Sequence, residues 1–129
     1  MAVIKSGATT DQLTVDPTSK AARVTQYDAA GNVVTSGIPV ATTVTNSNVA
    51  SSATNVTLLA SNTSRRGASM FNDSTQAAYV KFGATATTSS FTYKVFPSQT
   101  LEFPVPMYTG IVDALWDSAN GSMRIAESV

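Results

Sequence analysis

The carboxylates of Asp113 and Asp117 come nearest to catalytic spacing in this sequence. Paired carboxylates can hydrolyse a glycosidic bond when they lie roughly 5 to 9.5 Å apart. These two belong to the run GIVDALWD, which has the composition of a β-strand, and four residues of strand span about 13 Å. The spacing therefore argues against acid–base catalysis by this pair, and we predict no catalytic residues.

The chain contains no histidine and no cysteine. This composition excludes Ser-His-Asp hydrolysis, imidazole-bound metals, thiolate zinc sites and disulfides. Calcium prefers hard oxygen ligands, but the three aspartates near the N-terminus have the spacing of no known calcium loop: Asp11, Asp16 and Asp28. We therefore expect a non-enzymatic protein with no metal and no cofactor.

Charge is low and balanced. Eight basic and eight acidic residues cancel, so there is no net field to attract nucleic acid or an anionic membrane. Only 12% of the residues are charged, against about 25% in ordinary globular proteins. No apolar run approaches the roughly 20 residues that cross a bilayer, and the opening MAVIKSG lacks the apolar region of a signal peptide. Partners are expected to be proteins, not nucleic acids or membranes.

Short β-type runs separated by turn residues fill the chain from about residue 54. In AAYVKFG, for example, Val80 and Phe82 alternate with Tyr79 and Lys81, which indicates a strand with one buried face. Turns recur every 8–12 residues or so, a spacing typical of a sandwich or jelly roll. Seven strands are expected, at residues 55–61, 67–72, 77–83, 91–96, 100–105, 110–117 and 122–127.

The first third of the chain has too few large apolar residues to bury itself. Short strands are expected at residues 13–15, 23–27 and 32–34, with Gly31-Asn32 in the turn of a hairpin. Residues 35–52 are interpreted as a linker that becomes an edge strand after Pro39. The predicted fold is all-β: an extended N-terminal arm with a short hairpin and linker over residues 1–52, then a small β-sandwich or jelly roll over residues 53–129.

The order of motifs from residue 56 onward is more specific than the composition. A strand leads into Asn62, the pair Arg65-Arg66 precedes a strand that ends at Asn72, and the next strand ends at Gly83. A proline-marked turn at residue 97, a TGI-type strand at residues 109–116 and a last strand ending at residue 127 complete the order. This order resembles a small β domain of tailed-bacteriophage structural proteins. The resemblance implies a structural protein present in many copies.

The segment IKSGATTDQLTVDPTSKAARVTQYD is also similar to the opening of phage virion proteins, where it precedes unrelated C-terminal domains. That placement implies a docking segment. Its apolar residues are the expected partner contacts, since a two-stranded hairpin is marginal alone in water: Val3, Ile4, Leu13, Val15 and Val24. Burial against a neighbour would stabilise each by roughly 1.5–3 kcal/mol before ordering entropy is subtracted; alternatively, the arm packs on its own sandwich.

Four further residues are candidate surface contacts: Arg65, Arg66, Met107 and Tyr108. The alternative for the arginines is a solvated turn in which one of them holds a loop carbonyl or Asp73, and the alternative for Met107 and Tyr108 is packing. Trp116, the single tryptophan, lies in an apolar run and is expected in the core or in a subunit interface.

The expected role is that of a capsid decoration (cement) protein in the virion, made in the host cytoplasm. It would be a homo-oligomer, expected to be a trimer, that contacts the major capsid protein or another virion protein through the arm. One alternative is a tail, fibre or neck component. Another is a carbohydrate-binding module for host polysaccharide, which requires exposed aromatic residues among four candidates: Tyr79, Tyr93, Tyr108 and Trp116.

Overall fold

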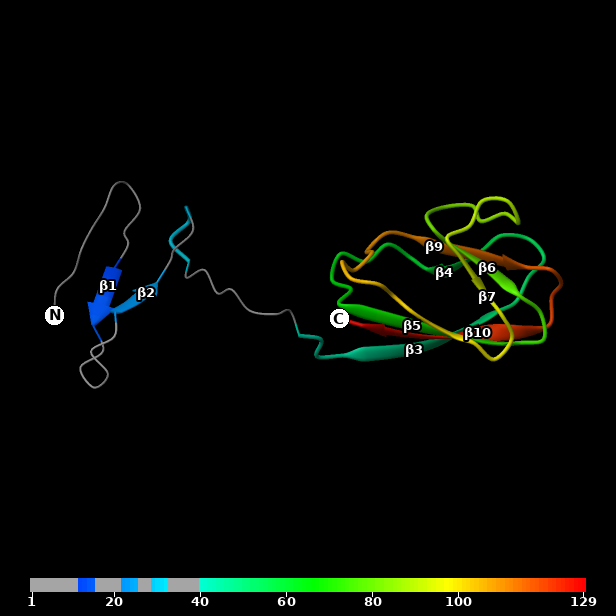
Figure 1. Cartoon of the computed structure of the whole chain (residues 1–129), viewed down its shortest axis with the longest axis horizontal. Helices are drawn as coiled ribbons and strands as arrows, with labels where there is room; N and C mark the ends of the chain where they lie inside the picture. Colours follow the sequence, from blue (N-terminus) through cyan, green and yellow to red (C-terminus); the bar gives the residue numbers. More distant parts are fainter. Residues whose placement is uncertain (1–11, 16–21, 26–28, 33–39) are drawn as a thin grey trace. The chain divides into compact units, whose positions relative to one another are not determined.

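The computed structural model of the chain describes residues 12–15, 22–25, 29–32 and 40–129. The chain divides into two compact units, Met1–Ile38 and Pro39–Val129, which are drawn in Figure 1 and described separately below. All regular structure in the described ranges is β-strand. No helix in this part of the chain is long and apolar enough to cross a membrane.

In the first unit, β1 (Gln12–Val15) pairs antiparallel with β2 (Ala22–Thr25). Leu13 is the register partner of Val24, so three of the predicted arm contacts lie on these two strands, whereas Val3 and Ile4 lie outside the described residues. The sequence predicted a different hairpin, in which the strand at residues 23–27 pairs with residues 32–34. Gly31 does adopt the positive φ, 84°, that its predicted turn requires, but residues 33 and 34 lie outside the described part.

The second unit contains eight strands in two antiparallel sheets of four (Figure 1). The first sheet has the order β3-β10-β5-β8 and the second the order β4-β9-β6-β7. Their bounds are β3 Val44–Ala50, β4 Val56–Leu59, β5 Gly67–Ser74, β6 Ala78–Phe82, β7 Tyr93–Val95, β8 Thr100–Glu102, β9 Val112–Trp116 and β10 Gly121–Ser128.

The pairing follows a simple order along the chain. The first strand of the unit pairs with the last, and the remaining pairs are β4 with β9, β5 with β8, and β6 with β7. The second unit is thus one long antiparallel double strand, which folds over so that β10 also pairs with β5 and β9 with β6. This is the jelly-roll arrangement, and the all-β sandwich prediction is confirmed.

All seven expected strands of the sandwich are present, and β3 is the edge strand expected within residues 35–52. The compact unit begins at Pro39, whereas the expected boundary followed residue 52. Every residue of β3 except Val49 is exposed, so the strand lacks the alternation of apolar residues that marks a half-buried strand. Its ladder to β10 holds it in the first sheet as an edge strand.

The core lies between the two sheets. Met70 and Asn72 of β5 project inward and are register partners of Ile125 and Met123 of β10. The opposing sheet contributes inward-facing residues that are all at most 2% exposed: Ala78, Val80, Val95, Val112, Ala114 and Trp116. The residues that alternate with them along each strand lie on the outer faces of the two sheets.

Candidate functional site

Arg65 lies inside the jelly roll, not on its surface. The arginine is only 1% exposed. Its guanidinium donates hydrogen bonds to three carbonyl oxygens: Ala60 at 2.7 Å, Tyr108 at 2.8 Å and Gly110 at 3.0 Å. Its Nε donates to Glu127 Oε1 at 2.6 Å. The five donors of an arginine suit such a role, and they join the β4–β5 connection, the β8–β9 connection and β10.

This geometry corrects the prediction that Arg65 is a surface contact. The predicted alternative was a solvated arginine that holds a loop carbonyl or Asp73. Arg65 does hold loop carbonyls, but its side chain is buried and its acidic partner is Glu127 instead of Asp73. Asp73 pairs with Arg124 on the surface. Arg66 is exposed, while Met107 and Tyr108 are half-buried and pack on the core.

Asp113 is the second buried ionic group, and it lies on the outward side of β9 at 3% exposure. Its Oδ2 accepts hydrogen bonds from Asn55 Nδ2 at 2.9 Å and from the Thr85 amide at 2.7 Å, and its Oδ1 accepts one from the Thr57 hydroxyl at 2.9 Å. Asn55 Oδ1 in turn accepts from the Ala86 amide. This network holds the loop after β6 against the sheet.

Burial alone would raise the pKa of Asp113 because it penalises the charged form. The hydrogen bond from Asn55, then those from the Thr85 amide and Thr57, act in the opposite direction, and the positive charge of Lys81 adds to them. The outcome is a pKa below the usual value of 3.8. At neutral pH the Asp113 carboxylate is therefore ionised, and its three hydrogen bonds come from the chain itself.

Trp116 and Asn72 form a buried polar contact between the two sheets. Trp116 Nε1 donates to Asn72 Oδ1 at 3.2 Å, and Asn72 Nδ2 donates to the carbonyl oxygens of Gln76 and Val95 at 2.8 Å each. Trp116 is 1% exposed, which is the core position expected for it and removes it from the candidates for sugar stacking.

Two of the other candidate aromatics also pack inward. Tyr93 makes an edge contact with Phe82 at 5.5 Å between ring centroids, and Tyr108 stacks on the same ring at 5.1 Å and 12°. Tyr79 alone of the four is on the outward face of the second sheet. There its ring meets Phe91 edge-on, with the centroids 5.1 Å apart.

Tyr79 belongs to an aromatic patch that we define by Tyr79, Phe91, Lys94 and Phe96. Phe91 is 40% exposed and Phe96 is 56% exposed. Lys94 Nζ lies 4.9 Å from the centroid of Tyr79 and 5.5 Å from that of Phe96, distances at which a cation is attracted by the ring faces. Phe91 and Phe96 flank β7. Neither was a predicted contact residue, although both stand at the ends of the strand expected at residues 91–96.

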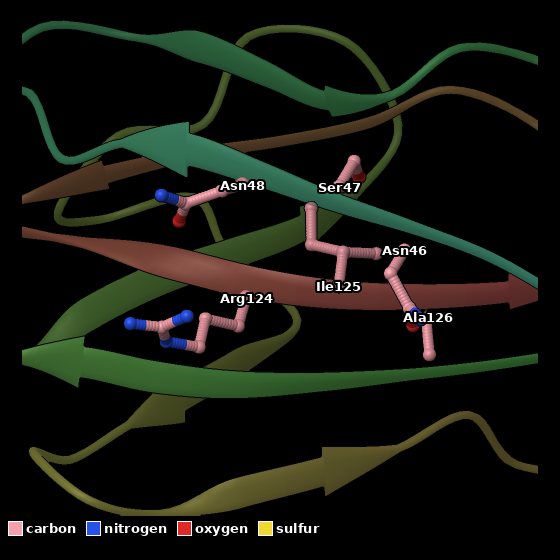
Figure 2. Close-up of a pocket in the computed structure, with 6 residues that line it drawn as sticks. All are labelled: Asn46, Ser47, Asn48, Arg124, Ile125 and Ala126. Carbon is pink, nitrogen blue, oxygen red and sulfur yellow. The ribbon is translucent and has the colours of Figure 1, made fainter.

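A shallow groove of about 400 Å³ runs along β3 and β10 on the first sheet. Figure 2 shows its six lining residues: Asn46, Ser47, Asn48, Arg124, Ile125 and Ala126. Arg124 is the register partner of Asn48, and its guanidinium pairs with Asp73 at 2.6 Å. The groove thus offers amides and a hydroxyl, with its one cation already paired.

No cluster of three or more acidic side chains able to hold a metal ion occurs in residues 12–15, 22–25, 29–32 and 40–129. Over the same residues, every buried side-chain nitrogen and oxygen has a hydrogen-bond partner. The surface features of these residues are the aromatic patch, the groove and the edge of β3. The chain matches no family model, no curated protein and no solved structure.

Proposed function

We propose that this chain is a non-enzymatic structural protein of a bacteriophage virion, and specifically a capsid decoration protein. In this role the jelly roll is displayed on the particle, and the N-terminal segment makes the contacts to neighbouring subunits and to the major capsid protein. The protein acts as a homo-oligomer, expected to be a trimer. Stabilisation of the particle comes from added buried interface and requires no chemistry.

The observation that carries this proposal is the division of the chain at Ile38. The jelly roll has its own core between two sheets, from Leu58 in β4 to Ile125 in β10. The N-terminal unit carries apolar residues of its own, and in this proposal they contact another protein. Jelly rolls are common in viral capsid proteins, but they serve many functions, so the fold supports the proposal only together with this division and the phage-like motif order.

The two buried ionic side chains also support a structural role. Arg65 and Asp113 both have their hydrogen-bonding capacity directed to the chain itself. A neutral surface with few charges is suited to dense packing among like copies, since no strong field opposes their approach.

The test uses phage heads that lack the protein. We expect the full chain to bind such heads at a copy number that scales with the capsomers. A variant lacking residues 1–38 should retain the same Trp116 fluorescence and the same unfolding transition but should not bind. Binding of both proteins with equal affinity would contradict docking by the N-terminal unit, and binding of neither would contradict the decoration role.

The aromatic patch favours a second candidate, attachment to host polysaccharide. Aromatic rings that are exposed together can stack on sugar rings, and Lys94 would suit an acidic polysaccharide. Replacement of Phe91 and Phe96 together by alanine should then abolish retention on immobilised host polysaccharide. Val105→Ala, at a side chain that is 92% exposed outside the patch, is the control. Equal retention of both variants and the parent protein would exclude the patch as the sugar site.

A further inference from the structure

The edge strand β3 is unusually open to pairing. It has seven residues, and on its outer side it has no strand partner among the described residues. Natural proteins protect such edges with lysines, prolines, bulges or very short strands. The run VTNSNVA of β3 contains no charge and no proline, and its ladder to β10 is continuous from Val44 to Ala50.

The hydrogen bonds at its two ends fix which backbone groups face outward. Thr43 and Val129 exchange bonds of 3.0 and 2.9 Å, and the Ser51 amide donates to the Gly121 carbonyl at 3.0 Å. Since antiparallel pairs alternate between bonded and non-bonded positions, residues 43, 45, 47, 49 and 51 face β10. Residues 44, 46, 48 and 50 therefore direct their N–H and C=O groups away from the sheet.

The sequence of β3 is nearly symmetric about Ser47. Asn46 mirrors Asn48, the β-branched Thr45 mirrors Val49, and the small apolar Val44 mirrors Ala50. We propose that β3 pairs antiparallel with β3 of a second copy of this chain, across a two-fold axis that passes through Ser47. Each side chain would then face one of the same kind, the condition for a self-complementary contact.

The outward backbone groups are in phase with this register. Asn46 of one copy faces Asn48 of the other, and Val44 faces Ala50, so all four outward-directed residues of each strand form hydrogen-bonded pairs. Because β3 carries no charge, no like charges meet across the axis. Thr45 and Ser47 are exposed even though they lie on the same side of β3 as half-buried Val49. The space around them is open to a neighbour.

The amides of β3 favour a second copy as the partner of its outer edge. Asn46 and Asn48 lie on the face of the sheet that bears the groove (Figure 2), and each amide offers both donors and an acceptor, so facing amides of two copies can satisfy one another. The inference does not depend on the virion role. A strand contact of this length is smaller than a standard interface of about 1,600 Å², so it acts alongside any contacts made by the N-terminal segment.

Engineered cysteines test the register directly, because the chain has none of its own. In the proposed pair Ser47 faces its own copy at a non-bonded position, with Cα atoms about 4.5 Å apart, within disulfide range. Ser47→Cys in the full chain should form a covalent dimer under mild oxidation at least ten times faster than Thr45→Cys. The control residue is on the same face and is also exposed, but the Thr45 positions of two copies would lie about 13 Å apart.

Equal rates for the two cysteine variants, or no dimer from Ser47→Cys, would overturn the proposal. One of these results is also expected if the N-terminal segment of a neighbour, and not a second β3, occupies the edge. A second variant, Ser47→Lys, places two ammonium groups opposite each other at the axis. Because Ser47 is exposed, the Trp116 unfolding transition should be unchanged, while self-association measured by light scattering should weaken at least tenfold. Unchanged self-association would also overturn the proposal.

Discussion

Arg65 and Glu127 meet inside the jelly roll, where Arg65 Nε donates to Glu127 Oε1 at 2.6 Å. The arginine side chain is fully buried, whereas that of Glu127 retains 19% of its exposure. The same carboxylate oxygen accepts a hydrogen bond from Asn62 Nδ2 at 3.2 Å. One end of the sandwich therefore depends on a charged pair that connects residues 62 positions apart in the chain.

Arg65→Met tests this dependence. The substitution removes the arginine donor from three loop carbonyls and leaves the Glu127 carboxylate with only the hydrogen bond from Asn62, and removal of one partner of a buried pair costs about 3–5 kcal/mol. We expect that loss in the free energy of unfolding by urea, followed by Trp116 fluorescence. Arg66→Met, at the exposed neighbouring arginine, should change it by less than about 0.5 kcal/mol. Equal losses in the two variants would show that Arg65 does not hold the loops together.

The pKa of Asp113 predicts a dependence of stability on pH. Its folded value lies below the usual 3.8, so the unfolded chain takes up the proton first as the pH falls. The contribution of the Asp113 charge is therefore complete above pH 3.8 and is lost as the pH falls through the folded pKa. Asp113→Asn should be less stable than the parent protein by about 1–3 kcal/mol at neutral pH, and this difference should shrink in acid.

Asp117→Asn is the matched control for that titration. Asp117 directly follows β9 and is exposed, so its replacement should change the free energy of unfolding by less than about 0.5 kcal/mol at neutral pH. The measurement is urea unfolding of the three proteins at several values between about pH 6 and pH 2.5. A difference between Asp113→Asn and the parent that stays constant over this range would contradict the assignment.

The strands of the sandwich were predictable because their chemistry is periodic. Val80 and Phe82 face the core from β6, while Tyr79 and Lys81 face outward, as their alternation indicates. β3 was predictable as an edge strand within residues 35–52 but not in its bounds, because its polar residues follow no period: its stability comes from a ladder to β10, the last strand of the chain. Pairing between such distant segments leaves no local signal.

The role of Arg65 was not predictable for a related reason. It stands beside Arg66 in the same turn, and nothing in the local sequence distinguishes the two. The choice is made by Glu127 and by the carbonyls of the β8–β9 connection, which only the fold brings together. Tyr108 illustrates the same limit, since its contact with Phe82 arises from an irregular connection without periodicity.

Asn72 is expected to be among the most sensitive positions for substitution. Asn72→Ala would remove the acceptor of the Trp116 indole N–H and the side-chain donor to the Val95 carbonyl, while the Gln76 carbonyl would keep the hydrogen bond from the Ser74 hydroxyl. Because buried polar groups left unsatisfied cost about 1–3 kcal/mol each, we expect a loss of at least about 2 kcal/mol and a shifted Trp116 emission maximum. Ser69→Ala, on the other face of β5, should leave both quantities unchanged. Parent-like emission from Asn72→Ala would contradict the contact.

The turn between β9 and β10 requires glycine at position 121 for two independent reasons. Gly121 has a φ of 86°, and a Cβ there would collide with the backbone carbonyl oxygen of Asp73. Gly31 has nearly the same φ, 84°, but a Cβ there would meet nothing within 4 Å.

A left-handed backbone costs about 1–3 kcal/mol, and at position 121 the collision adds to it. Gly121→Ala should therefore lower the free energy of unfolding of the jelly roll by about 3 kcal/mol, whereas Gly31→Ala, in the other unit, should leave the Trp116 transition unchanged. Equal transitions for the two variants would mean that the turn can rearrange to accept a side chain.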